Sequence, residues 1–129
     1  MIGIIVISHG SLARELVKST EMLMGESDQL AYEGIMPEDS SDHFYERVSA
    51  LTSRLDTGDG VAALVDLYGG TPCNTVARIS RERNMRIVTG ANLPMVMTAV
   101  AERTEEMTLN DFVAAVLAMG KESVAEFSV

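Results

Sequence analysis

Apolar residues along this chain alternate between short uninterrupted runs and stripes that recur every three or four positions. The runs predict buried strands, at residues Ile2–Ile7, Leu30–Ile35, Val61–Val65 and Arg86–Thr89. The stripes predict a helix after each strand and a further helix near the end of the chain. Strands that are apolar throughout and alternate with helices favour a parallel sheet covered on both faces. We therefore expect a doubly wound α/β domain, with strand order 2-1-3-4.

The first two helix patterns also predict which face each helix buries. The first helix is expected over residues 11–24 and ends at Gly25, with Leu12, Leu16, Leu23 and Met24 on one apolar face. The second is expected from about residue 41 to residue 55, with Phe44, Val48, Leu51 and Leu55 in the core.

The later helices are marked mainly by the residues at which they begin. The third starts near Pro72, with Thr71 as its N-cap. The segment "GANLPM" opens the fourth, and Thr108 begins a capping box for the fifth, which ends at Gly120. The final "SVAEFSV" could form one more strand, because alternate residues from Ser123 to Val129 share one face.

Two polar side chains stand where neighbouring strands of this sheet end. His9 follows the first strand and Asp66 follows the third, and a sheet of this order has its ligand crevice beyond those two ends. A carboxylate that accepts the Nδ1–H of an imidazole fixes its tautomer and leaves Nε2 with a free lone pair. Such an imidazole is a nucleophile, or a base for a nearby nucleophile.

The segments around His9 and Asp66 carry groups suited to an oxyanion. Two helix N-termini aim at the same edge, Gly10 and Gly70 allow backbone amides to approach, and Ser11 and Thr71 offer hydroxyls. The hydroxyl of Ser8 and the backbone of Gly69 are further candidates. A phosphorylated histidine needs an orienting carboxylate and amides for the phosphate oxygens. We find no metal cage, and phosphoryl transfer between imidazoles requires no metal or cofactor in principle.

Each of these residues also has a simpler explanation. A single histidine at a strand end is most often a surface residue, and an aspartate there often caps a turn or a helix. The argument for a functional role is that the predicted topology brings these residues to the same edge of the sheet. His43 is expected to be solvated on a polar helix face. Cys73 lies in a first helical turn, but without an evident base of its own it is expected to be a packed small residue.

Length and charge narrow the classes of function. The chain has 129 residues, enough for one domain, and 47% of them are hydrophobic. Nine methionines are expected to fill the core. Ten basic against nineteen acidic side chains give a net charge of −9, which opposes nucleic acid and anionic membranes.

One cysteine excludes an intramolecular disulfide framework. We find neither a membrane-spanning run nor a signal-peptide pattern, so we expect a cytoplasmic protein.

Three segments in order resemble the enzyme IIA component of the mannose-family bacterial sugar phosphotransferase system. They are the opening strand with "SHG" and its helix, the segment "LVDLYGGTPCN", and "GANLPM" after the fourth strand. The late "AVLAMGKESV" is similar to the last helix of that family. The resemblance covers essentially the whole chain, which we therefore expect to be a single IIA-type phosphocarrier domain over residues 1–129.

The resemblance implies a phosphoryl carrier. His9 would be phosphorylated by the histidine-containing phosphocarrier protein HPr, which is itself charged from phosphoenolpyruvate by enzyme I. The phosphoryl group would pass to a histidine of the enzyme IIB component and then to a sugar entering through membrane components IIC and IID. Asp66 matches the carboxylate that bonds the active histidine, and Thr71 stands where the family has a Ser or Thr near the phosphoryl group.

The resemblance also implies an assembly. Family members are homodimers that exchange a C-terminal strand, and "SVAEFSV" could serve as that strand. Some members are fused to a IIB domain, whereas this chain would be a free-standing IIA subunit. Tyr68 and Cys73 differ from the residues typical of the best-known sugar transporters, which leaves the sugar open.

Other functions remain as alternatives. The phosphocarrier subunit of the phosphotransferase-dependent dihydroxyacetone kinase shares this fold, although it usually has a different glycine-rich segment. A regulatory domain of the same fold is a further alternative. A receiver domain is disfavoured, because such domains need acidic residues after strand 1, where this chain has Ser8 and His9. A histidine phosphatase would need an arginine at the position of Ser8 and a second, well-placed histidine.

Overall fold

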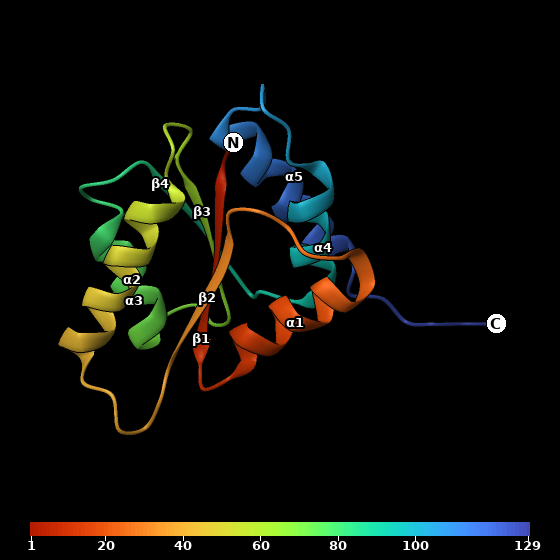
Figure 1. The fold of residues 1–129 in the computed structure, drawn as a ribbon. Coiled ribbons are helices and arrows are strands. Elements are labelled where there is room, and N and C mark those ends of the chain that lie inside the picture. Colours follow the sequence, from red (N-terminus) through yellow and green to blue (C-terminus); the bar gives the residue numbers. More distant parts are fainter.

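A computed structural model describes residues 1–129, and its centre is one parallel four-stranded sheet (Figure 1). The strands are β1 (Gly3–His9), β2 (Leu30–Ile35), β3 (Val61–Val65) and β4 (Met85–Thr89), in the order β2-β1-β3-β4. The helices are α1 (Leu12–Met24), α2 (Ser41–Leu55), α3 (Gly70–Ile79), α4 (Leu93–Glu102) and α5 (Leu109–Glu122). The predicted α/β class and strand order are confirmed.

The helices form two layers, one on each face of the sheet. Figure 1 shows α1, α4 and α5 on one side and α2 and α3 on the other. Alternate residues of β1 supply the two cores: Ile4 and Val6 face the α1–α4–α5 layer, whereas Ile5 and Ile7 face α2 and α3. All five residues of β3 are buried. Central parallel strands are covered on both faces, which explains why their sequences are apolar throughout.

The predicted buried face of α1 is wrong. The helix buries Ala13, Val17 and Thr20, and Leu16 is partly buried against the same core. In contrast, Leu12, Leu23 and Met24 are exposed. Small side chains bring α1 close to β1 and β2, and the larger residues therefore point outward from the helix.

The start of α3 and the role of the methionines also differ from expectation. The N-cap of α3 is Gly69 and the helix begins at Gly70, so Thr71 lies inside the first turn and is not the cap. Gly69 and Gly70 have φ of 84° and 78°, a backbone conformation that glycine adopts without strain.

Of the methionines, only Met85 and Met95 are buried in the core.

The other helix predictions are largely confirmed. In α2, Phe44, Val48 and Leu55 are buried as expected, but Thr52 is buried where Leu51 is only partly so. Thr108 caps α5 by accepting the amide of Asp111. None of the helices is long and apolar enough to cross a membrane.

The C-terminal segment forms no strand within this chain. Residues 124–129 have no regular secondary structure, and Figure 1 shows them extending away from the body of the molecule. Val124 and Phe127 are 81% and 87% exposed. The predicted fifth strand is therefore wrong for the single chain, because no strand edge of the same chain pairs with it.

Candidate functional site

His9 and Asp66 meet at the carboxyl ends of β1 and β3, as the topology predicted. Asp66 Oδ2 lies 2.9 Å from His9 Nδ1 and accepts the backbone N–H of His9 at 3.0 Å. The amide of Asp66 in turn donates to Ile7 O at 3.0 Å. One carboxylate oxygen therefore fixes both the main chain and the ring of His9. With Nδ1 protonated toward Asp66, the lone pair of the imidazole is on Nε2.

The Nε2 edge of the His9 ring lies against the start of α3. A Cβ built on Gly70 would stand 3.1 Å from His9 Cε1 and 3.3 Å from Nε2. The missing side chain at Gly70 therefore lets the first turn of α3 approach the ring. The first N–H groups of a helix have no intrahelical acceptor and carry partial positive charge, so this edge of the ring faces an environment that favours an anion.

The turn after His9 is fixed by β2. The N–H of Gly10 donates to Ile35 O at 2.8 Å, and a Cβ on Gly34 would lie 1.9 Å from Gly10 O. The two segments can be this close only because residue 34 is glycine. Since the Gly10 amide is already paired, it is not a free donor for an anion, contrary to the expectation from sequence. The N–H of Ser11 donates to no group of the chain.

Ser8 is a helix-capping residue and not part of the exposed site. Its hydroxyl oxygen accepts the N–H of Ala13 at 2.7 Å, and its side chain is completely buried. Ser11 occupies the N-cap position of α1 but its side chain caps no amide. Ser8 therefore replaces Ser11 in capping α1, and Ser11 is exposed at the surface.

A pocket of about 440 Å³ opens beside His9. On one side its lining is His9, Gly10 and Thr71, which sequence analysis had selected. On the other side the lining comes from the end of β2 and the connection to α2, and consists of Ile35, Met36, Pro37, Asp39 and Ser41. The side chain of His9 is 49% exposed, so a second molecule can reach the ring.

Sequence analysis missed the wall formed by residues 35–41. The apolar run ends at Ile35, and no motif marks Met36, Pro37, Asp39 or Ser41. The strand order itself was the available signal, because β2 lies next to β1 and its carboxyl end must therefore lie beside His9. His43 is exposed in the first turn of α2, as expected, and does not line the pocket. Cys73 is partly buried against the α2–α3 core.

The family model EIIA-man, described as "PTS system fructose IIA component", matches residues 3–117, where PTS denotes the phosphotransferase system. The chain belongs to this family. The match includes both His9 and Asp66, and it agrees with the mannose-family IIA resemblance that the sequence motifs indicated.

Two characterised relatives of this IIA-family chain differ in size. The PTS system mannose-specific EIIAB component of Escherichia coli (strain K12) is 32% identical over 124 residues, which are 95% of this chain and 38% of that protein. The PTS system fructose-specific EIIA component of Bacillus subtilis (strain 168) is 28% identical over 124 residues, which are 95% of this chain and 84% of the relative. The chain thus spans well under half of the EIIAB relative.

Solved structures of IIA components share the fold throughout. The phosphotransferase system component EIIA from Streptococcus agalactiae superposes with a TM-score of 0.90 at 26% identity, covering 98% of this chain and 97% of that one. The mannose/sorbose-specific IIA subunit from Enterococcus faecalis also has a TM-score of 0.90, at 27% identity, covering 99% and 96%. The doubly wound fold of this chain is therefore that of PTS IIA components.

Proposed function

We propose that this chain is a phosphoryl carrier that accepts a phosphoryl group on His9 Nε2 from phosphorylated HPr and passes it to a histidine of enzyme IIB. From there the group would reach a sugar that enters through the membrane components IIC and IID. The observation that carries the proposal is the pairing of His9 Nδ1 with Asp66, which leaves Nε2 as the available nucleophile beside α3. Family membership supports the same role.

The transfer moves one phosphoryl group between two imidazoles. The Nε2 lone pair attacks phosphorus, a new P–N bond forms, and the P–N bond to the donor ring breaks with its electron pair returning to the donor nitrogen. The Nδ1 proton stays on His9, where the Asp66 carboxylate stabilises the positive charge that develops in the ring. Transfer to IIB is the same step with the roles exchanged. No cofactor takes part in this scheme.

The groups around Nε2 are suited to hold the phosphoryl oxygens. We assign this role to the Ser11 amide and hydroxyl, to the backbone at Gly70 and to Thr71, which lines the pocket beside His9. Gly10 would then contribute through its close approach to the ring, since its amide is paired with Ile35 O. These donors lie at the starts of α1 and α3, where the helix dipoles favour a doubly charged anion.

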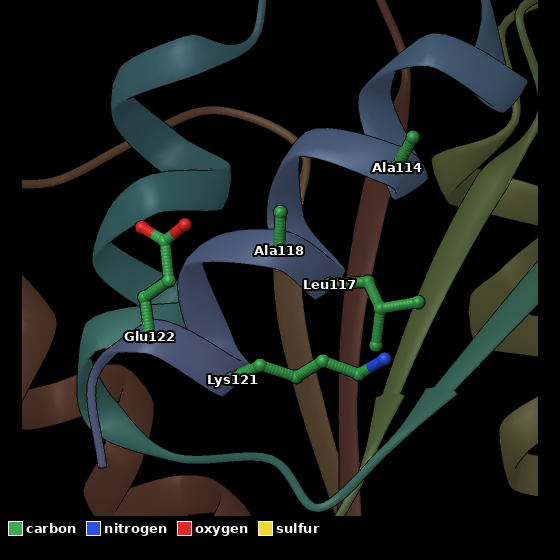
Figure 2. Close-up of a pocket in the computed structure, with 5 residues that line it drawn as sticks. All are labelled: Ala114, Leu117, Ala118, Lys121 and Glu122. Atoms are coloured by element: carbon green, nitrogen blue, oxygen red, sulfur yellow. The ribbon is translucent and has the colours of Figure 1, made fainter. Parts of the chain in front are cut away.

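The proposal includes a cytoplasmic homodimer in which residues 1–129 act as one IIA-type domain. A strand contributed by the partner could add to β4, which is an edge strand with no partner on its outer side. Two hollows adjoin this edge. One, of about 400 Å³, lies along α5, where Figure 2 shows Leu117 and Lys121 extending to the same side. The other, of about 280 Å³, reaches from Thr89 in β4 to Val124.

The direct test is phosphorylation by the general proteins of the system. The purified chain is incubated with phosphoenolpyruvate, enzyme I and HPr, and the product is examined for an acid-labile, alkali-stable phosphoryl adduct. We expect full labelling of the wild type and of His43→Ala, and none of His9→Ala. His43 is the matched control because it is the only other histidine. Labelling that survives His9→Ala would refute the assignment.

A further inference from the structure

The pocket beside His9 has one wall without an assigned role, the connection between β2 and α2. This connection, residues 36–40, supplies Met36, Pro37 and Asp39 to the wall, and it is joined to the turn after His9 because Ile35 O accepts the Gly10 amide at 2.8 Å. A protein that delivers a phosphoryl group to His9 approaches a ring beside a pocket that this connection lines. The position of the connection therefore bears directly on phosphoryl exchange.

One arginine holds the connection in place. Arg47, on α2, donates from Nη2 to Asp39 Oδ2 at 3.0 Å and from Nε to Glu33 Oε1 at 3.0 Å. It thereby links the pocket wall to β2. Its guanidinium also lies 5.5 Å from the centre of the Phe44 ring, whose side chain is buried. The arginine is thus anchored at both carboxylates and against the core.

Asp39 connects Arg47 to the main chain of the pocket wall. The same Oδ2 that binds Arg47 accepts the N–H of Met36 at 2.8 Å, which closes the connection into a turn. The Met36 hydrogen bond and the Arg47 contact lower the pKa of the Asp39 carboxyl below its ordinary value. Asp39 is therefore ionised at neutral pH, and both bonds are charge-assisted.

The core does not need this arrangement to hold α2 on the sheet. Phe44, Val48 and Leu55 are buried along α2 and already attach the helix to the α2–α3 core. The two ion pairs of Arg47 lie outside that core, and both carboxylates are partly exposed. Their specific effect is to fix where Met36 and Pro37 stand relative to His9.

We propose that Arg47 is a positioning residue for phosphoryl exchange, which acts through Asp39 to hold the 36–40 connection as a seat for phosphorylated HPr beside His9. The inference rests on the proposed function. Arg47 touches neither the His9 ring nor Asp66. Removing its side chain should therefore weaken docking of the donor protein and leave the nucleophile unchanged.

The test compares a protein donor with a small chemical donor. Phosphorylated HPr docks as a protein against the wall, whereas phosphoramidate is too small to need that seat: its P–N bond breaks as the bond to Nε2 forms, and ammonia leaves. For Arg47→Met and Asp39→Asn we expect KM for phosphorylated HPr to rise roughly ten- to a hundredfold. We expect the rate with phosphoramidate and the melting temperature to stay close to wild type.

Three further variants separate positioning from general structural damage. Arg54 is an exposed arginine on the same helix, and it pairs with no carboxylate. Arg54→Met should therefore leave KM unchanged. Arg47→Lys should restore part of the loss, since an ammonium can reach one carboxylate but not form the fork between two. The double variant Asp39→Asn/Arg47→Met should be no worse than either single variant.

The outcomes distinguish this inference from the proposed function. An unchanged KM in both Arg47→Met and Asp39→Asn would overturn the positioning role while wild-type labelling still supports the carrier. An equal loss with phosphoramidate would also overturn it, because the defect would then lie in His9 itself. A wild type that phosphorylated HPr does not label would contradict the proposed function, and the inference with it.

Discussion

At the scale of single residues, the orientation of the His9 ring is set by the atoms that its two edges meet. The Nδ1 edge and the backbone N–H share Asp66 Oδ2, so the ring cannot rotate freely about its side-chain bonds. The Nε2 edge faces Gly70, where a side chain is absent. In the proposed mechanism, the carboxylate thus selects Nε2 as the reactive nitrogen, and the glycine leaves room for the phosphoryl group.

The two glycines that start α3 provide a matched pair of substitutions. Both have positive φ, and Gly69, with φ 84° and ψ −175°, lies in a region that is essentially restricted to glycine, so alanine at either position should destabilise the fold by about 1–3 kcal/mol. Only the Gly70→Ala methyl would touch His9, because a Cβ on Gly69 meets nothing within 4 Å. We expect Gly70→Ala to slow phosphoryl transfer by at least about tenfold, measured by rapid-quench labelling.

Gly69→Ala is the control and should retain transfer at close to the wild-type rate once stability has been matched by lowering the temperature. Equal loss of transfer in both variants would mean that backbone strain, and not contact with the ring, is the cause.

At the scale of elements, α1 shows that the apolar pattern identifies a helix more securely than its orientation. Leu12, Leu23 and Met24 are larger than Ala13, Val17 and Thr20, yet the smaller residues are the buried ones. The hydrophobic effect favours burying large side chains, but the close packing of α1 beside β1 and β2 requires small ones. The distance between α1 and the sheet cannot be read from the sequence alone.

This difference between the two faces of α1 can be measured by denaturant unfolding. Val17→Ala should lower the free energy of unfolding by roughly 1–3 kcal/mol, because it removes buried methyl groups. Leu23→Ala should change it by less than about 0.5 kcal/mol, because that side chain is 56% exposed. A larger loss for Leu23→Ala would show that α1 presents its leucine face to the core.

The strands and the His9–Asp66 pair could be predicted, because they follow from local pattern and strand order. The ranges of β2 and β3 agree with the apolar runs, and the order of strands brings the two side chains together. The start of α3 could not be placed, since Thr71–Pro72 is ordinary capping chemistry and the positive φ of two successive glycines overrides it. The Arg47–Asp39 contact depends on side-chain packing between α2 and β2, which no motif records.

At the scale of the whole molecule, Arg103 links the segments at the end of the sheet opposite the site. Its guanidinium donates to the carbonyls of Ile2 and Gln29 at 2.8 and 3.1 Å, and to Ser27 Oγ at 2.9 Å. Burial lowers the pKa of Arg103, although a guanidinium remains charged in proteins. This arginine therefore joins the end of α4 to the starts of β1 and β2, while the opposite end of the sheet carries His9.

The C-terminal segment gives a prediction about assembly. Removing residues 124–129 should leave the fold of the single chain intact, because these residues are exposed and belong to no helix or strand. If the segment pairs with a partner's sheet, the truncated protein should sediment as a monomer and the full chain as a dimer. A dimer that survives the truncation would place the interface elsewhere.

The central claim is that the phosphoryl group is carried on Nε2 of His9. Its most direct test is a nitrogen-15 NMR spectrum of the histidine-labelled protein, recorded before and after charging with phosphoenolpyruvate, enzyme I and HPr. We predict a phosphorus coupling at Nε2 of His9, with Nδ1 still bearing its proton toward Asp66. Coupling at Nδ1, or at either nitrogen of His43, would contradict the account.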